Sequence, residues 1–205
     1  MKWLKRFLLF SLLFYIVTLL GYFTYILTSL NAFINHQVIE DFAQEIKDSP
    51  AVDAELISLF NKINSQVIQN DPSVFEVLLS RFSSDYYECP CIDISYRLHL
   101  AARKNTKIWQ QRFFSNQYIF AHHLHQQVTQ KQCLNYLLNN YDFLYYVKGV
   151  YEASQFYFKK ELSGLTTKEK LGLLIMLRNP RRYNPIKSPA YYNRRLEQVM
   201  RKIAL

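Results

Sequence analysis

A run of 24 residues without a charged side chain, Phe7 to Leu30, constrains this chain more than any other feature. As a helix it would extend about 36 Å, which exceeds the ~30 Å hydrocarbon core of a bilayer. A cleaved signal peptide is the alternative, but the apolar region of such a peptide is usually about 7–15 residues long and ends in a small-x-small site. We therefore predict one retained transmembrane helix over residues 7–30.

The charges on either side of this run predict its orientation. Lys2, Lys5 and Arg6 precede it, whereas Glu40 and Asp41 follow it. Because positive charge is enriched on the cytoplasmic side, residues 1–6 are expected in the cytoplasm and everything after the helix outside it. This predicts a juxtamembrane segment over 31–48 and one extracytoplasmic domain over 49–205.

The net charge of +9 is concentrated near the ends of the chain. Between residues 178 and 202, eight Lys or Arg side chains accompany a single Glu, while the middle of the chain is nearly neutral. A high isoelectric point therefore does not indicate a nucleic-acid partner here. Since half of the residues are hydrophobic, disorder is excluded. With four glycines and no phosphate-loop pattern, we expect no nucleotide and no other cofactor.

Apolar residues recur at helical spacing through most of the domain, so we predict an all-α fold. A helix is expected to begin at Ser49-Pro50, and a capping box at Thr166 and Glu169 is expected to begin another that ends near Asn179. The remaining expected helices cover 74–82, 94–104, 109–128, 129–138, 149–158 and 190–203.

The three cysteines, Cys89, Cys91 and Cys133, are expected to be buried or free thiols. A bridge from Cys133 to either of the others is the alternative, because Cys89 and Cys91 are too close together to pair with each other easily. His122 and His125 lie one turn apart, but no carboxylate or cysteine completes a ligand set. We read them as a solvated helix face and predict no metal site.

The basic stretch near the C-terminus has three interpretations. It could be a solvated helix face, a site for anionic lipid head groups, or a site for a diphosphate-bearing ligand. Arginine is the side chain that binds phosphate bidentately, which makes Arg181, Arg182, Arg194 and Arg195 candidates for the last two.

The C-terminal third carries a specific resemblance. Residues 149–160 read GVYEASQFYFKK, Leu165-Thr166 and Glu169 follow, and residues 177–185 read LRNPRRYNP. This resembles glycosyltransferase family 51, the peptidoglycan transglycosylases and the matching half of penicillin-binding proteins, whose pattern is G-x-x-A-A-x-x-Y-F-G-K, L-T-x-x-E and R-Y-N-P. The resemblance implies an all-helical, lysozyme-like domain that is anchored to the bacterial cytoplasmic membrane and lies in the periplasm or outside the cell, with lipid II as its ligand.

The family's two glutamates would fall on amides in this chain. Its K-x-x-I-L-x-x-Y-L-N pattern falls on residues 130–139, with Gln130 for the lysine and Asn139 kept, and its R-K-x-x-E pattern then ends on Gln117. The glutamate of its E-D-x-x-F pattern would be Asn64. In the family the first glutamate takes a proton from the acceptor hydroxyl and the second assists the departing diphosphate. An amide cannot accept that proton at neutral pH, and it carries no charge to hold a cation. Losing a general base costs about 10²–10⁴ in rate.

The leading hypothesis is a degenerate, anchored family-51-like protein that binds lipid II, glycan or other cell-wall synthesis proteins without polymerising. By the same resemblance, Asn139, Arg182 and Arg195 would bind the substrate. The alternative is an active, divergent transglycosylase, in which another acid substitutes for the missing glutamates. The candidates for that acid are Glu55, Glu76, Asp85, Glu88 and Asp93. A third possibility is a scaffold without a ligand cleft, which acts through protein partners in the membrane.

Overall fold

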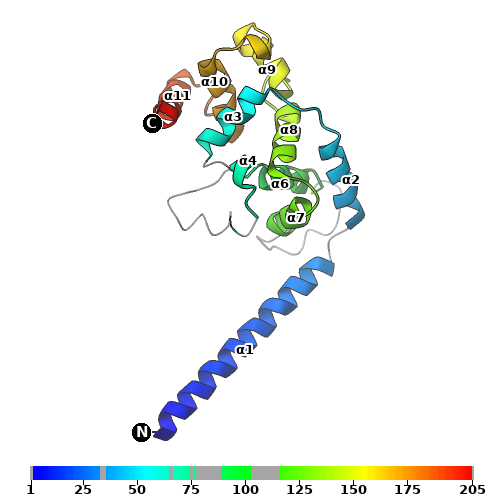
Figure 1. The fold of residues 1–205 in the computed structure, drawn as a ribbon, viewed down its shortest axis with the longest axis vertical. Coiled ribbons are helices and arrows are strands. Elements are labelled where there is room, and N and C mark those ends of the chain that lie inside the picture. Colours follow the sequence, from blue (N-terminus) through cyan, green and yellow to red (C-terminus); the bar gives the residue numbers. More distant parts are fainter. Residues whose placement is uncertain are drawn as a thin grey trace. The chain divides into compact units, whose positions relative to one another are not determined.

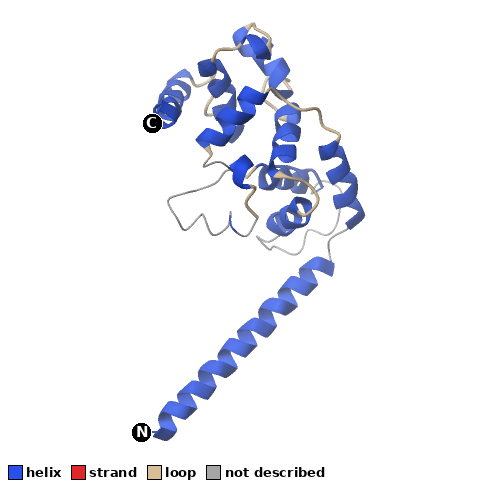
Figure 2. Ribbon diagram, viewed as in Figure 1, coloured by secondary structure: helices blue, strands red, loops and turns tan. Residues whose placement is uncertain are grey.

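The computed structural model describes residues 2–32, 36–64, 67–73, 76, 89–102 and 116–204, and within these ranges helices are joined by loops and turns (Figures 1 and 2). An isolated bridge between Asp142 and Lys148 is the only extended pairing among them. The chain divides into a first unit over 1–37 and a second over 38–205. The prediction of an all-α architecture is confirmed for the described residues.

The first unit is dominated by α1 (Lys2–Ala32). Its described large apolar side chains, such as Phe14 and Tyr25, are exposed. Within the described residues, however, no helix meets the length and hydropathy that a membrane crossing requires. The transmembrane helix predicted over residues 7–30 is therefore not supported.

Most of α2 (His36–Lys47) belongs to the second unit, and the helix lies inside the segment predicted as juxtamembrane. Its buried residues, Ile39, Phe42, Ala43 and Ile46, follow the spacing of one helix face. The Phe42 ring packs edge-on against Tyr136, with ring centroids 5.3 Å apart, and the Tyr136 hydroxyl donates to Glu45. Residues 39–46 of α2 therefore pack on the rest of the second unit.

The next helix, α3 (Ala54–Ile63), begins later than the Ser49-Pro50 pair predicts. Asp53 is its N-cap, because the Asp53 carboxylate accepts a hydrogen bond from the Leu56 amide at 2.8 Å. Residues 49–52 instead run along another helix, where the Val52 amide donates to the Asn135 side chain. A short helix, α4 (Val67–Asn70), follows, and the helix predicted over 74–82 lies almost wholly outside the described residues.

A disulfide joins two helices at the centre of the unit. Cys91, in α6 (Pro90–Ala102), is bonded to Cys133, in α8 (Gln130–Asn140). Cys89 remains a buried free thiol, and burial raises its pKa to about 12. The expectation of three unpaired thiols is thus wrong, and the alternative bridge from Cys133 is present. Between these helices the described chain contains α7 (Asn116–His125), part of the helix predicted over 109–128.

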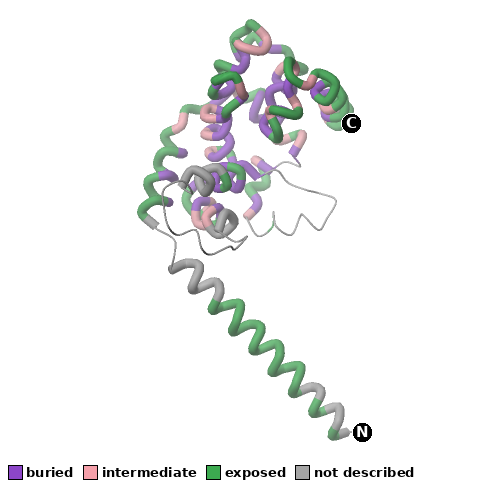
Figure 3. The backbone as a smooth tube through the Cα atoms, turned by 180° about the vertical axis from the view of Figure 1, so that it is seen from behind, coloured by how far each residue is buried: buried purple, intermediate pink, exposed green. Residues whose placement is uncertain are grey.

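The C-terminal helices follow the sequence signals closely. They are α9 (Gly149–Phe158), a 3₁₀ turn over Leu162–Gly164, α10 (Thr167–Arg178) and α11 (Pro189–Ala204). The predicted capping box forms, since Thr166 accepts from the Glu169 amide and Glu169 accepts from the Thr166 amide. Residues 170–177 of α10 are all buried, because α3, α9 and α11 pack around this helix (Figure 3).

Candidate functional site

A pocket of about 150 Å³ lies where α3, α10 and α11 meet, and these three helices pack side by side (Figure 1). Four of its lining residues are aliphatic, and the polar ones are Asn64, Arg178, Arg195, Gln198 and Lys202. The volume is below the 300–1,000 Å³ typical of sites that enclose a whole small molecule. The pocket therefore suits one polar group of a larger ligand.

Asn64 reaches this pocket because α3 ends there. It is the C-cap of α3 and is 7% exposed. Its backbone amide and its side-chain Nδ2 both donate to the Phe60 carbonyl, each at 3.1 Å. The side chain is thus held at the helix end by its own last turn, which orients the amide without help from a charged neighbour.

Three basic side chains surround the same pocket. Arg195 and Lys202 are seven residues apart on α11, close to two helical turns, and therefore share a face. Arg178 is the last residue of α10. The Lys202 ammonium donates to the Ile63 carbonyl at 2.8 Å, where a cation is favoured by the carbonyls at the end of α3.

No carboxylate stands among the pocket's lining residues within the described chain. The positive charge of the lining side chains favours an anionic group such as a phosphate or diphosphate. The structure thereby brings together two predicted site residues, Asn64 and Arg195, and adds Arg178, Gln198 and Lys202, which the sequence did not single out.

Asn139, predicted to bind substrate, is engaged within the fold. Its side-chain amide donates to Pro50 O at 2.8 Å, to Asn135 O at 3.0 Å and to Ser49 Oγ at 3.2 Å. Asn139 thereby anchors residues 49–50 to α8, and it does not line the pocket. Its backbone lies against Gly149, where an added Cβ would be only 2.5 Å from the Asn139 carbonyl oxygen.

Arg182, the second predicted substrate-binding residue outside the pocket, lies on an aromatic surface. Its guanidinium is 5.3 Å from the centre of the Tyr191 ring, which Arg194 also approaches at 6.0 Å. Within the R-Y-N-P pattern it is Asn184 that is buried, and its side chain accepts from the amides of Ile186 and Lys187. That asparagine shapes the connector between α10 and α11.

Gln117, the predicted counterpart of the second glutamate, lies in the first turn of α7. Its side chain falls outside the part of the chain that the structure describes. The opposition of Asn64 and Gln117 across a groove therefore stays a prediction. His122 and His125 lie on α7 as expected, and the described ranges contain no cluster of His, Cys, Asp and Glu that could hold a metal ion.

Three of the acids named as possible replacements, Glu55, Glu76 and Asp93, do not line the pocket. Glu55 accepts from Lys170 at 2.6 Å, and this hydrogen bond lowers the pKa of the carboxyl. The backbone N–H of Ser73 lowers the pKa of Glu76 in the same way. Asp93 is exposed on the first turn of α6, and Asp85 and Glu88 lie outside the described residues. A lowered pKa leaves Glu55 and Glu76 poor proton acceptors at neutral pH.

The sequence analysis did not predict the burial of two polar residues, Lys170 and Gln130. Lys170 lies in the leucine-rich part of α10, yet it forms ion pairs with Asp53 and Glu55. Gln130 is fully buried, and its backbone amide donates to Asp71 while its side chain bonds Pro72 O, the Cys91 amide and Cys89 Sγ. Gln130 stands where the family pattern has lysine, and that departure was the available signal.

The fold and pocket define an all-helical domain with a basic recess at the junction of three helices. The family model described as Transglycosylase matches residues 98–204, which is just over half of the chain. This chain therefore belongs to the transglycosylase family.

A relative supports this placement. The chain is 31% identical to penicillin-binding protein 4 of Bacillus subtilis (strain 168) over 101 residues, which cover 48% of this chain and 16% of that protein. The chain thus spans about a sixth of the relative's length. Gln117, Asn139 and the α11 cations lie inside the family match, whereas Asn64 precedes it.

Proposed function

We propose that this chain is a glycosyltransferase-like protein of cell-wall synthesis that binds lipid II through its diphosphate without polymerising it. The observation that carries the proposal is the pocket lining, in which the amide of Asn64 accompanies the cationic side chains of Arg195 and Lys202, and none of the described lining residues is a carboxylate. Family membership supplies the class of ligand, and the charge of the recess favours its anionic part.

The proposal separates binding from catalysis on chemical grounds. Transfer of a sugar to a hydroxyl acceptor requires a base for the hydroxyl proton, and an asparagine side chain is not one. The cations of the recess need no such base to hold a diphosphate. A ligand is therefore retained while the rate falls by the factor that general-base catalysis supplies, about 10²–10⁴.

A location outside the cytoplasmic membrane is part of the same proposal. The Cys91–Cys133 disulfide supports it, because structural disulfides persist in oxidising compartments and are rare in the cytosol.

Polymerisation of fluorescent lipid II by the full-length protein tests the catalytic half. We expect no glycan chains on a gel under conditions in which an active family member forms them. Robust chains would reject the proposal and establish the alternative of an active, divergent transglycosylase.

Binding of lipid II in detergent tests the claim that the chain binds this ligand. Arg195→Ala is expected to weaken binding by roughly tenfold or more, since a charge-assisted hydrogen bond contributes about 1.5–3 kcal/mol. Arg201→Ala is the matched control, because Arg201 lies on the same helix with the same charge but does not line the pocket. Equal loss in both variants would mean general attraction to basic residues, and no binding by the native chain would favour a scaffold that acts through protein partners.

A further inference from the structure

The turn between α8 and α9 has an unusual backbone. Three consecutive residues without a glycine, Leu144, Tyr145 and Tyr146, have φ values of 71°, 55° and 64°. The turn is closed by Val147 N to Leu144 O at 3.0 Å and by Phe143 N to Val147 O at 2.9 Å. The Leu144 amide also donates to the Asp142 carboxylate at 2.8 Å. Residues in the left-handed backbone conformation therefore form a tight turn that several hydrogen bonds hold in place.

Tyrosine is a poor choice for this backbone. Positive φ at the two central residues of such a turn is normally supplied by glycine, asparagine or aspartate, because a Cβ in the left-handed region approaches the following carbonyl. Packing does not compensate at Tyr146, whose side chain is fully exposed at 104%. The fold alone would be better served by Asn or Gly at this position.

The neighbouring rings form a supported aromatic surface. Tyr145 stacks on Phe156 of α9, with centroids 5.6 Å apart and planes inclined by 24°. Phe156 in turn meets the Tyr157 ring edge-on at 4.9 Å, and the Tyr157 hydroxyl donates to the Phe143 carbonyl. Tyr145 is still 46% exposed, so one side of a positioned ring is available beside Tyr146.

The charges around this turn balance. The acids Asp142, Glu152 and Glu161 accompany the bases Lys148, Lys159 and Lys160 on the turn, on α9 and on the segment that follows α9. This contrasts with the basic recess at α11 and does not favour an anionic ligand. Two exposed aromatic rings in a neutral setting instead suit an uncharged ligand with an apolar face.

We propose that Tyr145 and Tyr146 form a platform on which a sugar ring of the glycan strand stacks through its C–H face. Backbone strain that the fold does not use is found at binding sites, where it presents a side chain to a ligand. The inference rests on the proposed function for the class of ligand and names a second surface, separate from the pocket of Asn64 and Arg195. A glycan strand held here is extended and uncharged along its sugar backbone.

The test uses the N-acetylglucosamine hexamer chitohexaose as the probe and the full-length chain, with binding measured by calorimetry. Tyr146→Asn is expected to weaken binding at least tenfold and to leave the Tm unchanged or about 3 °C higher, since asparagine tolerates the left-handed region. Tyr96→Asn is the control, because Tyr96 is 48% exposed on α6, outside the turn and α9, and it should leave the affinity unchanged.

Two outcomes would overturn the platform. The first is no binding of chitohexaose by the native chain while Arg195-dependent lipid II binding persists, which would leave the proposed function intact. The second is equal chitohexaose affinity in Tyr146→Asn and the native chain. If Tyr146→Asn then also partitions less onto neutral phosphatidylcholine vesicles, the turn is a membrane contact. Retained chitohexaose binding in a chain that ignores lipid II would support the platform and reject the diphosphate site.

Discussion

The ammonium of Lys170 lies 2.6 Å from Oε2 of Glu55, and this contact joins the first turn of α10 to the first turn of α3. The lysine also pairs with Asp53 at 3.2 Å, and its side chain is only 3% exposed. Burial alone would lower the pKa of Lys170, but the hydrogen bonds to Glu55 and Asp53 raise it above the usual range. The lysine is therefore charged, and it holds together two of the helices that form the pocket.

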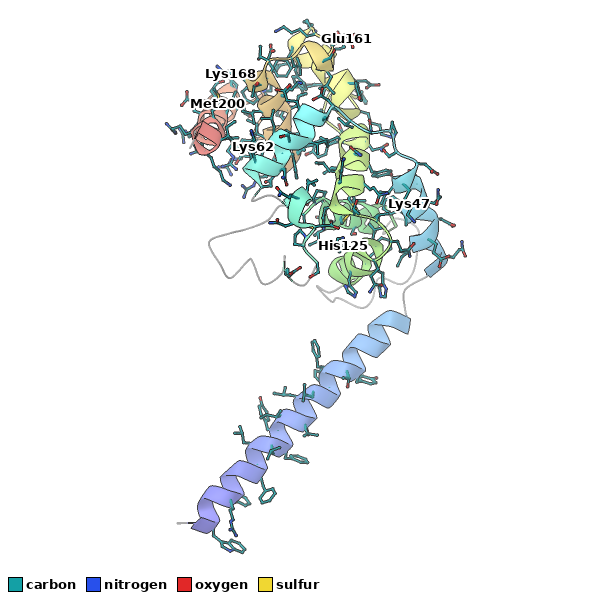
Figure 4. All side chains as sticks on the ribbon, viewed as in Figure 1. Lys47, Lys62, His125, Glu161, Lys168 and Met200 are labelled. Atoms are coloured by element: carbon teal, nitrogen blue, oxygen red, sulfur yellow. A yellow bond between two sulfur atoms is a disulfide. The ribbon has the colours of Figure 1, made fainter. Side chains whose placement is uncertain are left out.

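Lys170→Ala is expected to destabilise the protein by roughly 1–3 kcal/mol, because it removes the hydrogen bonds of a buried lysine to two carboxylates. The measurement is the free energy of unfolding in urea. Lys168→Ala is the control, since Lys168 is exposed on the same helix, as Figure 4 shows, and should change stability by about 0.5 kcal/mol or less. A similar loss of stability in both variants would contradict the stabilising role of the Lys170 ion pairs.

The lowered pKa of Glu169 predicts that the fold loses stability in acid. The hydrogen bond from Lys160, followed by that from the Thr166 amide, lowers the pKa of Glu169 to about 2. A depressed pKa stabilises the fold above the unfolded-state value near 4.5, and this stability is lost as the pH falls toward 2. Glu169→Gln keeps the capping-box geometry but removes the charge, so the stability difference from the native protein should be about 0.5–1 kcal/mol at pH 7.

The measurement is urea unfolding at several pH values between 2 and 7. The difference between the native protein and Glu169→Gln should shrink as the pH falls from 4.5 toward 2. A difference that stays constant over this range would show that the charge of Glu169 contributes nothing.

Reduction of the disulfide is expected to cost about 4 kcal/mol, the loop-closure value for a separation of 42 residues. Urea unfolding with and without a reductant measures it. Cys89→Ala should keep this sensitivity, whereas Cys133→Ala should abolish it. If Cys89→Ala abolished it instead, Cys89 would be the partner of Cys133.

Gly149→Ala is expected to destabilise the protein by roughly 3 kcal/mol, since its φ of +79° and the nearby Asn139 carbonyl both oppose a Cβ. Gly164→Ala is the control, because no heavy atom lies within 4 Å of a Cβ placed there. Thermal unfolding of the two variants compares them directly. Equal Tm values would contradict the close approach of Asn139 and Gly149.

Local signals in the sequence located several elements well. The Gly149–Phe158 helix has its predicted bounds, and Thr166 with Glu169 begins the next helix as the capping box predicts. Both succeed because a capping box and an apolar periodicity depend on residues within a turn or two. Ser49-Pro50 failed as a helix start, since Asp53 caps that helix and Asn139 binds the Pro50 carbonyl from a distant part of the chain.

By itself, the sequence determined that this domain is helical, that it is basic near its C-terminus and that it belongs with the transglycosylases, because periodicity, charge and motif spacing are properties of neighbours along the chain. Only the tertiary structure decided which cysteine pairs with Cys133, which acids bind Lys170, and that Asn64 shares a recess with Arg195 and Lys202. These relationships depend on packing between helices that are distant in sequence, and no local pattern encodes that packing.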